Sequence, residues 1–123
     1  EYNFAVHLVR ALRDRREFAA ADDCVITPTF VPDLCHTALD LLIDGESGIW
    51  HLSNHGAVTW AAFAERIAEA SGLDTGLVRR VPASDLGWRA PRPANCALLS
   101  EKGSPMPDLD FAIERFVMEL RSA

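Results

Sequence analysis

The sequence has 123 residues, the length of one ordinary domain, and its 49% hydrophobic and 24% charged residues are typical of a globular protein with a buried core. The net charge of −6 argues against a surface for nucleic acid or anionic membranes, because both need a basic patch. A few local arginines would still suffice for a phosphate ligand. No apolar run is long enough to span a bilayer, no signal-peptide pattern opens the chain, and the three cysteines are irregularly spaced. We therefore expect free thiols in a cytoplasmic protein.

The chain opens with a predicted helix from Asn3 to about Arg16, followed by a short strand, Phe18–Ala21. One apolar stripe along the helix consists of Phe4, Leu8, Ala11 and Leu12. The arginines of this helix lie mostly off the stripe and are interpreted as a solvated face. Asp22 and Asp23 end the strand. Since adjacent strand residues point to opposite faces, we interpret this pair as a strand end or cap rather than an acid–base pair.

A second helix is predicted to begin at Pro32, whose missing N–H costs nothing at a first helical position, and to end at Gly45. Its expected inward stripe is Leu34, Ala38, Leu41 and Leu42, widened by Cys35 and Leu39. Because this helix is apolar on more than one side, we expect two neighbours to cover it. The segment Gly48–Asn54 is short, mostly apolar and bounded by turn residues, which predicts a buried, parallel strand.

A third helix is predicted with Thr59 as N-cap, a Val58–Phe63 hydrophobic staple and Gly72 at its end. A strand is predicted at Leu77–Val81. The proline-rich stretch Pro82–Pro107 is expected to be an ordered loop. A last helix should start near Asp108 and face inward with Leu109, Ile113, Phe116, Val117 and Leu120. This alternation of helices and strands predicts an α/β fold.

Most candidate chemical groups have a plain structural interpretation. His51 and His55 are four residues apart, but they straddle a strand end and a glycine turn, so we interpret them as packing or surface residues rather than metal ligands. The loop Trp88–Asn95 is more suggestive, because proline-stiffened arginines, including Arg92, suit bidentate phosphate binding. A surface loop with Trp88 in the core remains the alternative.

Four blocks of the sequence resemble motifs of the dTDP-4-dehydrorhamnose reductases, a family of extended short-chain dehydrogenases. Residues 22–34 resemble D-D-x-x-x-S-P-T-Y-x-x-D-L, residues 48–54 resemble G-I-Y-H-L-x-x, residues 59–64 resemble S-W-x-x-F-A, and residues 92–98 resemble R-P-x-N-S-x-L. The blocks occur in the family's order and cover nearly the whole chain. The sequence departs from the motifs at Thr27, Phe30 and Cys96, where the family has Ser, Tyr and Ser.

The resemblance implies an α/β fold, namely the small C-terminal substrate-binding part of an extended short-chain dehydrogenase, with about four helices and a few short strands. Residues 1–123 would form a single substrate-binding domain, a fragment of a longer chain whose N-terminal Rossmann domain is absent. The family reduces a 4-keto sugar on a nucleoside diphosphate, in dTDP-rhamnose biosynthesis, with NADPH or NADH bound by the Rossmann domain. Substrate-binding candidates carried over from the motifs are Thr27, Thr29, Arg92 and Asn95, with Arg92 nearest the diphosphate.

The family's catalytic groups are not found in this sequence. The only tyrosine, Tyr2, is followed four residues later by Val6 instead of lysine, the only lysine is Lys102, and no G-x-x-G-x-x-G motif occurs. We therefore expect no catalytic, cofactor-binding or metal-binding residues here, and an isolated chain without reductase activity. The alternatives are a non-catalytic interaction or regulatory module, or an α/β domain with another role. A homodimer is expected in isolation if the segment Ile49–Ser53 has lost its sheet neighbours.

Overall fold

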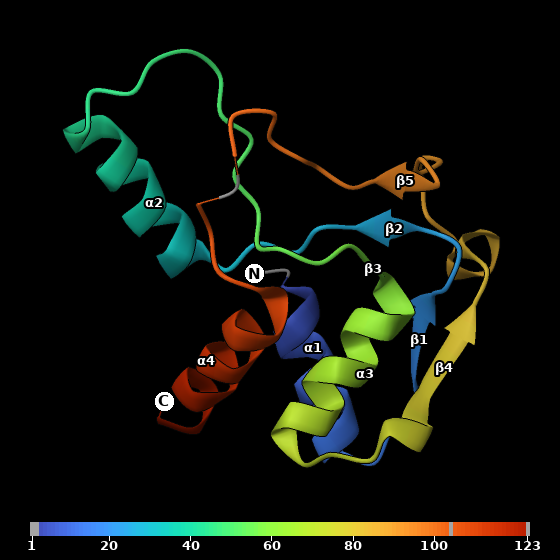
Figure 1. The fold of residues 1–123 in the computed structure, drawn as a ribbon. Coiled ribbons are helices and arrows are strands. Elements are labelled where there is room, and N and C mark those ends of the chain that lie inside the picture. Colours follow the sequence, from blue (N-terminus) through green and yellow to red (C-terminus); the bar gives the residue numbers. More distant parts are fainter. Residues whose placement is uncertain (1–2, 104, 123) are drawn as a thin grey trace. The chain divides into compact units, whose positions relative to one another are not determined.

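The computed structural model describes residues 3–103 and 105–122. Within these ranges the chain forms four α-helices among short strands, as predicted (Figure 1). The elements are α1 (Phe4–Arg13), β1 (Phe18–Ala21), β2 (Val25–Ile26), α2 (Val31–Ile43), β3 (Val58–Thr59), α3 (Trp60–Ser71), η1 (Thr75–Leu77), β4 (Val78–Val81), η2 (Ala83–Leu86), β5 (Asn95–Cys96) and α4 (Leu109–Ser122). None of the helices in the described part is both long and apolar enough to cross a membrane.

The chain divides into two compact units, each built from two separate stretches of sequence. Unit 1 contains Glu1–Val25 and Val58–Cys96, and unit 2 contains Ile26–Ala57 and Ala97–Ala123. The strands β3, β2 and β5, each two residues long, form a sheet in that order. The chain crosses from one unit to the other three times, and each crossing lies within or directly beside one of these short strands.

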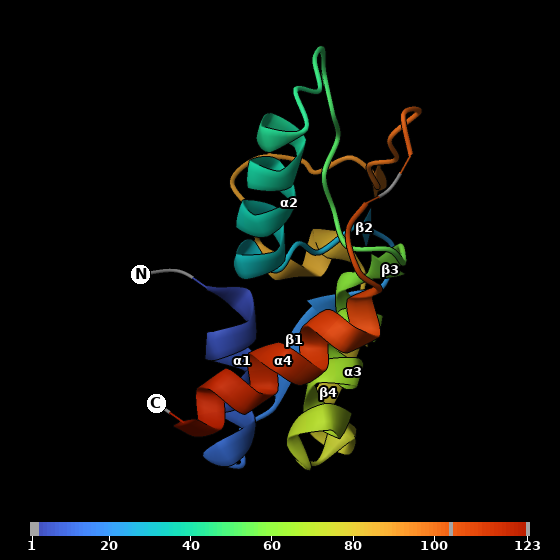
Figure 2. The ribbon, with the colours of Figure 1, turned by 60° about the vertical axis from the view of Figure 1, so that its left-hand side comes forward.

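Unit 1 is organised around a parallel pair of strands. β1 pairs with β4 in a register that runs from Phe18 opposite Val78 to Ala21 opposite Val81, which confirms both predicted strands. The helix α3 contacts both strands and packs beside α1 (Figures 1 and 2). Small side chains let these elements approach closely, and the core is rich in alanine: Ala11, Ala20, Ala21, Ala61, Ala64 and Ala68.

Local signals set the ends of the helices in unit 1. Thr59 Oγ1 accepts a hydrogen bond from the N–H of Ala62 at 3.1 Å, and Gly72 adopts a left-handed φ of 69°, so the predicted N-cap and C-cap of α3 are confirmed. The helix α1 ends at Arg13, three residues earlier than the predicted Arg16. Its end coincides with a left-handed backbone at Arg15, where φ is 56°.

The environment of α2, in unit 2, contradicts the prediction that neighbours cover the helix on two sides. Its buried residues are the polar Asp33 and Thr37, whereas Leu39, Leu42 and Ile43 are 55%, 74% and 80% exposed. The predicted inward stripe was therefore wrong: Leu34 and Leu41 are half-buried and Ala38 and Leu42 are exposed. In the described part of the chain, no other element covers this apolar face. The predicted glycine stop is confirmed, because Gly45 follows the helix with a φ of 71°.

The prediction of a strand at Gly48–Asn54 is also wrong, because this stretch follows an irregular path without strand geometry (Figure 1). The physical reason is that a strand needs a ladder partner, and none of the described strands pairs with this segment. Ile49 is 81% exposed. A single parallel bridge joins the following residue, His55, to Asp108, just before α4.

The remaining predictions for the C-terminal part are largely confirmed. The helix α4 buries Leu109, Ile113 and Val117 as expected, whereas Phe116 and Leu120 are half-buried. The proline-rich stretch before it contains the short helix η2 and the strand β5, so it is partly regular.

Candidate functional site

The loop that carries Thr27 and Thr29 lies in unit 2 and is held by side chain to backbone hydrogen bonds. Thr27 Oγ1 accepts a hydrogen bond from the N–H of Leu98 at 3.1 Å, and Thr29 Oγ1 donates to the carbonyl of Thr27 at 3.4 Å. Ser53 Oγ donates to the carbonyl of Leu98 at 3.3 Å, so the same backbone stretch also binds the segment before Asn54. Because Thr27 Oγ1 serves as an acceptor here, its own proton remains free to donate to a ligand.

Asn54 connects three separate parts of unit 2 and was not singled out from the sequence. Its side chain is fully buried, with 1% of the residue exposed. Asn54 Oδ1 accepts from the N–H of Phe30 at 2.7 Å, and Nδ2 donates to Asp33 Oδ2 and to the carbonyl of Pro107, both at 3.1 Å. Asn54 therefore fixes the end of the Thr27–Phe30 loop to the start of α2 and to Pro107, two residues before α4.

The other two candidates, Arg92 and Asn95, lie in unit 1 and are exposed. The guanidinium carbon of Arg92 is 6.0 Å from the centroid of the Trp88 ring, a distance that allows a cation–π contact. Trp88 is 37% exposed, so the alternative interpretation that this residue packs in the core is wrong. The N–H of Val25 donates to the carbonyl of Ala94 at 2.8 Å, which ties the loop before Asn95 to β2.

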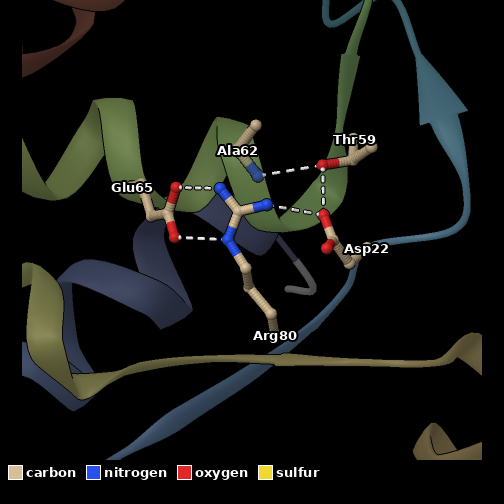
Figure 3. A network of polar contacts seen from close by, with 5 residues as sticks. All are labelled: Asp22, Thr59, Ala62, Glu65 and Arg80. Atoms are coloured by element: carbon tan, nitrogen blue, oxygen red, sulfur yellow. Dashed lines mark hydrogen bonds and ion pairs between the residues drawn. The ribbon is translucent and has the colours of Figure 1, made fainter.

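The acidic pair Asp22–Asp23 serves the architecture of unit 1, as interpreted from the sequence. Arg80 forms a bidentate pair with Glu65, with distances of 2.8 and 2.5 Å, and donates to Asp22 Oδ1 at 2.7 Å (Figure 3). Thr59 Oγ1 donates to the same Asp22 oxygen at 3.2 Å. These contacts link the end of β1, the start of α3 and β4, while Asp23 Oδ1 accepts from the start of η2 at 2.9 Å.

The charge on Arg80 is favoured by this arrangement. The hydrogen bonds that Arg80 donates to Glu65, together with the negative charge of Glu65, raise the pKa of Arg80, and Asp22 acts in the same direction. Arg80 therefore keeps its charge and holds Glu65 and Asp22 in place. Both Asp22 and Asp23 accept hydrogen bonds from other parts of unit 1.

The cysteines and histidines form no further site in the residues that the structure describes. No group of three or more His, Cys, Asp or Glu side chains lies close enough together there to hold a metal ion. His51 Nδ1 lies 3.4 Å from the carbonyl oxygen of Leu99. Burial raises the pKa of Cys24, with the charge of Asp23 adding to the effect, and this is the opposite of what a nucleophilic thiol needs. Tyr2, the only tyrosine, lies outside the described residues.

The only lysine, Lys102, has a local structural role in unit 2. Its Nζ donates to the carbonyl of Ser47 and lies 5.3 Å from the centroid of the Trp50 ring. These contacts connect the loop after α2 with the loop before α4.

The fold matches that of part of the dTDP-4-dehydrorhamnose reductases of known structure. The chain superposes with a TM-score of 0.87 on the crystal structure of dTDP-4-dehydrorhamnose reductase from Bacillus anthracis in complex with NADP, at 27% identity, covering 97% of this chain and 44% of that one. A dTDP-4-dehydrorhamnose reductase from Clostridium acetobutylicum gives a TM-score of 0.89 at 21% identity, covering 98% of this chain and 45% of that chain.

Residues 1–118 match the family described as the RmlD substrate binding domain, and the chain belongs to this family. The resemblance recognised from the four sequence blocks is thereby confirmed. The spore coat polysaccharide biosynthesis protein SpsK of Bacillus subtilis is 30% identical over 125 residues, covering 98% of this chain and 44% of that protein. The dTDP-4-dehydrorhamnose reductase of Escherichia coli is 28% identical, covering 96% and 44%. The chain thus spans less than half the length of these relatives.

Proposed function

We propose that this chain is the sugar-nucleotide-binding domain of an NADPH- or NADH-dependent reductase that acts on a dTDP-linked 4-keto-6-deoxy sugar. The observation that carries the proposal is the family match, which extends over residues 1–118 of 123. It is supported by relatives named as reductases of dTDP-4-dehydrorhamnose and of dTDP-4-keto-6-deoxy-D-glucose. Residues 1–123 act as one domain. Each unit is made of two separate stretches of sequence, which supports the view that neither unit forms a domain without the other.

The proposed substrate contacts are supported separately within each unit. In unit 2, the hydroxyls of Thr27 and Thr29 are held in a loop whose backbone is anchored by Asn54. In unit 1, Arg92 presents a planar, permanently charged fork that binds a diphosphate bidentately, and the neighbouring prolines lower the cost of ordering its loop. Asn95, three residues further along the chain, adds an amide.

The hydride transfer falls to a Rossmann domain elsewhere in the same protein. This assignment fits the sequence, which has neither a Tyr-x-x-x-Lys pair nor a glycine-rich dinucleotide loop. The Rossmann domain covers two exposed surfaces of this chain. One is the apolar face of α2, formed by Leu39, Leu42 and Ile43, and the other is the segment 48–54, which pairs with no described strand. The exposed free thiols of Cys35 and Cys96 suit a reducing cytoplasm.

Calorimetric titration of the full-length protein with dTDP tests the proposal. We expect binding that Arg92→Ala weakens by about 1.5–3 kcal/mol, the range for a lost hydrogen bond to a charged group. Arg13→Ala, on the exposed side of α1, is the matched control and should leave the affinity unchanged. Equal affinities of the Arg92 and Arg13 variants would remove Arg92 from the site. No binding of dTDP at all would favour the non-catalytic module.

A further inference from the structure

A buried carboxylate in unit 2 joins the start of α2 to the middle of α4. The Asp33 side chain is only 2% exposed and forms an ion pair with Arg115, 82 positions further along the chain. Its second oxygen accepts from Asn54 Nδ2 at 3.1 Å. Both oxygens of the carboxylate are therefore partnered, which is the condition under which a buried charge is tolerated.

Arg115 holds the loop residue Phe30 in two ways. Its guanidinium carbon lies 5.1 Å from the centroid of the Phe30 ring and 5.8 Å from that of Phe111, so the cation is placed against two aromatic rings. Through Asp33 and Asn54 it is also connected to the N–H of Phe30, which donates to Asn54 Oδ1 at 2.7 Å. The ring and the backbone of Phe30 are thus fixed by one connected set of groups.

The position of Phe30 gives this cluster a functional consequence. Phe30 directly follows Thr29, and the Thr27–Phe30 loop is the part of unit 2 assigned to the substrate. The other end of the loop is held by the hydrogen bond between Thr27 Oγ1 and the N–H of Leu98. Without the anchor at Phe30, the loop that carries the two threonine hydroxyls would be held at its Thr27 end only.

We propose that Arg115 is a positioning residue for substrate binding, acting through Phe30 and the Asp33–Asn54 pair to hold the Thr27–Thr29 hydroxyls in their binding geometry. The inference rests on the proposed function. Arg115 itself contacts no substrate: one third of its side chain is exposed and its charge is used by Asp33. A purely structural ion pair would stabilise the fold without affecting ligand affinity, and the test must separate these two roles.

The test compares Arg115→Met with the double variant Asp33→Asn/Arg115→Met in the full-length protein. Arg115→Met should lower the thermal midpoint, because a buried carboxylate loses its partner. It should also raise the Kd for dTDP about tenfold, and the KM for the sugar nucleotide similarly, with kcat within about twofold. The double variant removes the unpaired charge, so the midpoint should recover while the Kd and KM stay raised.

An unchanged Kd in Arg115→Met would overturn the proposal, and so would a double variant that recovers affinity together with stability. Arg13→Met, an exposed arginine on α1, is the matched control and should change neither quantity. Arg115→Lys keeps the charge and should give an intermediate Kd. Hydrogen exchange of the peptide containing Phe30, measured without ligand, should be faster in Arg115→Met. If the wild-type protein binds no dTDP, the proposed function fails, and unchanged exchange in that peptide would separately refute the anchoring.

Discussion

Replacing Asn54 with alanine should be among the most damaging single changes in unit 2. The change removes the acceptor for the N–H of Phe30 and the donor for the carbonyl of Pro107, two neutral hydrogen bonds with a net value of about 1 kcal/mol each. It also removes a donor to the buried Asp33 carboxylate, a bond to a charged group worth about 1.5–3 kcal/mol. The free energy of unfolding should therefore fall by about 3.5–5 kcal/mol.

Urea unfolding of the full-length protein, followed by tryptophan fluorescence, measures this loss. Ser53→Ala is the neighbouring control: Ser53 is also buried, but its hydroxyl donates one hydrogen bond, of 3.3 Å, to the carbonyl of Leu98, so about 1 kcal/mol is expected. Hydrogen exchange of the peptide that contains Phe30 should also rise in the Asn54 variant. If Asn54→Ala costs no more than Ser53→Ala, the reasoning about this network is refuted.

Three further predictions follow from local features. Thr59→Ala should destabilise the protein by about 1–2 kcal/mol in the same urea assay through loss of the α3 N-cap, whereas Thr59→Ser should be close to wild type; equal losses would contradict the capping role. Because the pKa of Cys24 is raised, less thiolate is present at any given pH, so iodoacetamide should label Cys24 more slowly than the exposed Cys35, with the difference lost in urea. The isolated chain should form a dimer, measured by light scattering, through the exposed apolar face of α2. Leu42→Glu/Ile43→Glu should return it to a monomer. A monomeric wild-type chain at high concentration would contradict association through this face.

Features determined by neighbouring residues were predictable from the sequence. The N-cap at Thr59, the glycine stops after α2 and α3, and the strand Phe18–Ala21 depend on interactions within a few residues, or on a short apolar run that finds a partner in the same unit. The cap and the glycine stops were predicted correctly because the interactions that set them lie within a few residues of one another, and the strand was predicted from its own apolar run.

The apolar patterns of α2 and of residues 48–54 were misleading for a physical reason. Such a pattern predicts that a face will be buried, but it does not say which part of the protein covers it. Leu42, Ile43 and Ile49 remain 74–81% exposed because no element of the described chain covers them. The same patterns are consistent with burial against a Rossmann domain, as the proposed function requires.

The polar cluster of unit 2 could not be predicted from the sequence. Asp33 pairs with Asn54 at a separation of 21 residues and with Arg115 at 82, and neither separation corresponds to a local motif. The family motifs alone identified the substrate candidates Thr27 and Thr29, whereas Arg92 and Asn95 were also indicated by the proline-stiffened loop that contains them.

The most direct test of the central claim is the oxidation of NADPH in the presence of a dTDP-4-keto-6-deoxy sugar, followed by absorbance. The full-length protein should consume NADPH only when the sugar nucleotide is present, and the isolated 123-residue chain should consume none. In the full-length protein, Arg92→Ala should raise the KM for the sugar nucleotide without changing the affinity for NADPH. Turnover by the isolated chain, or no sugar-dependent turnover by a folded full-length protein that binds NADPH, would contradict the account.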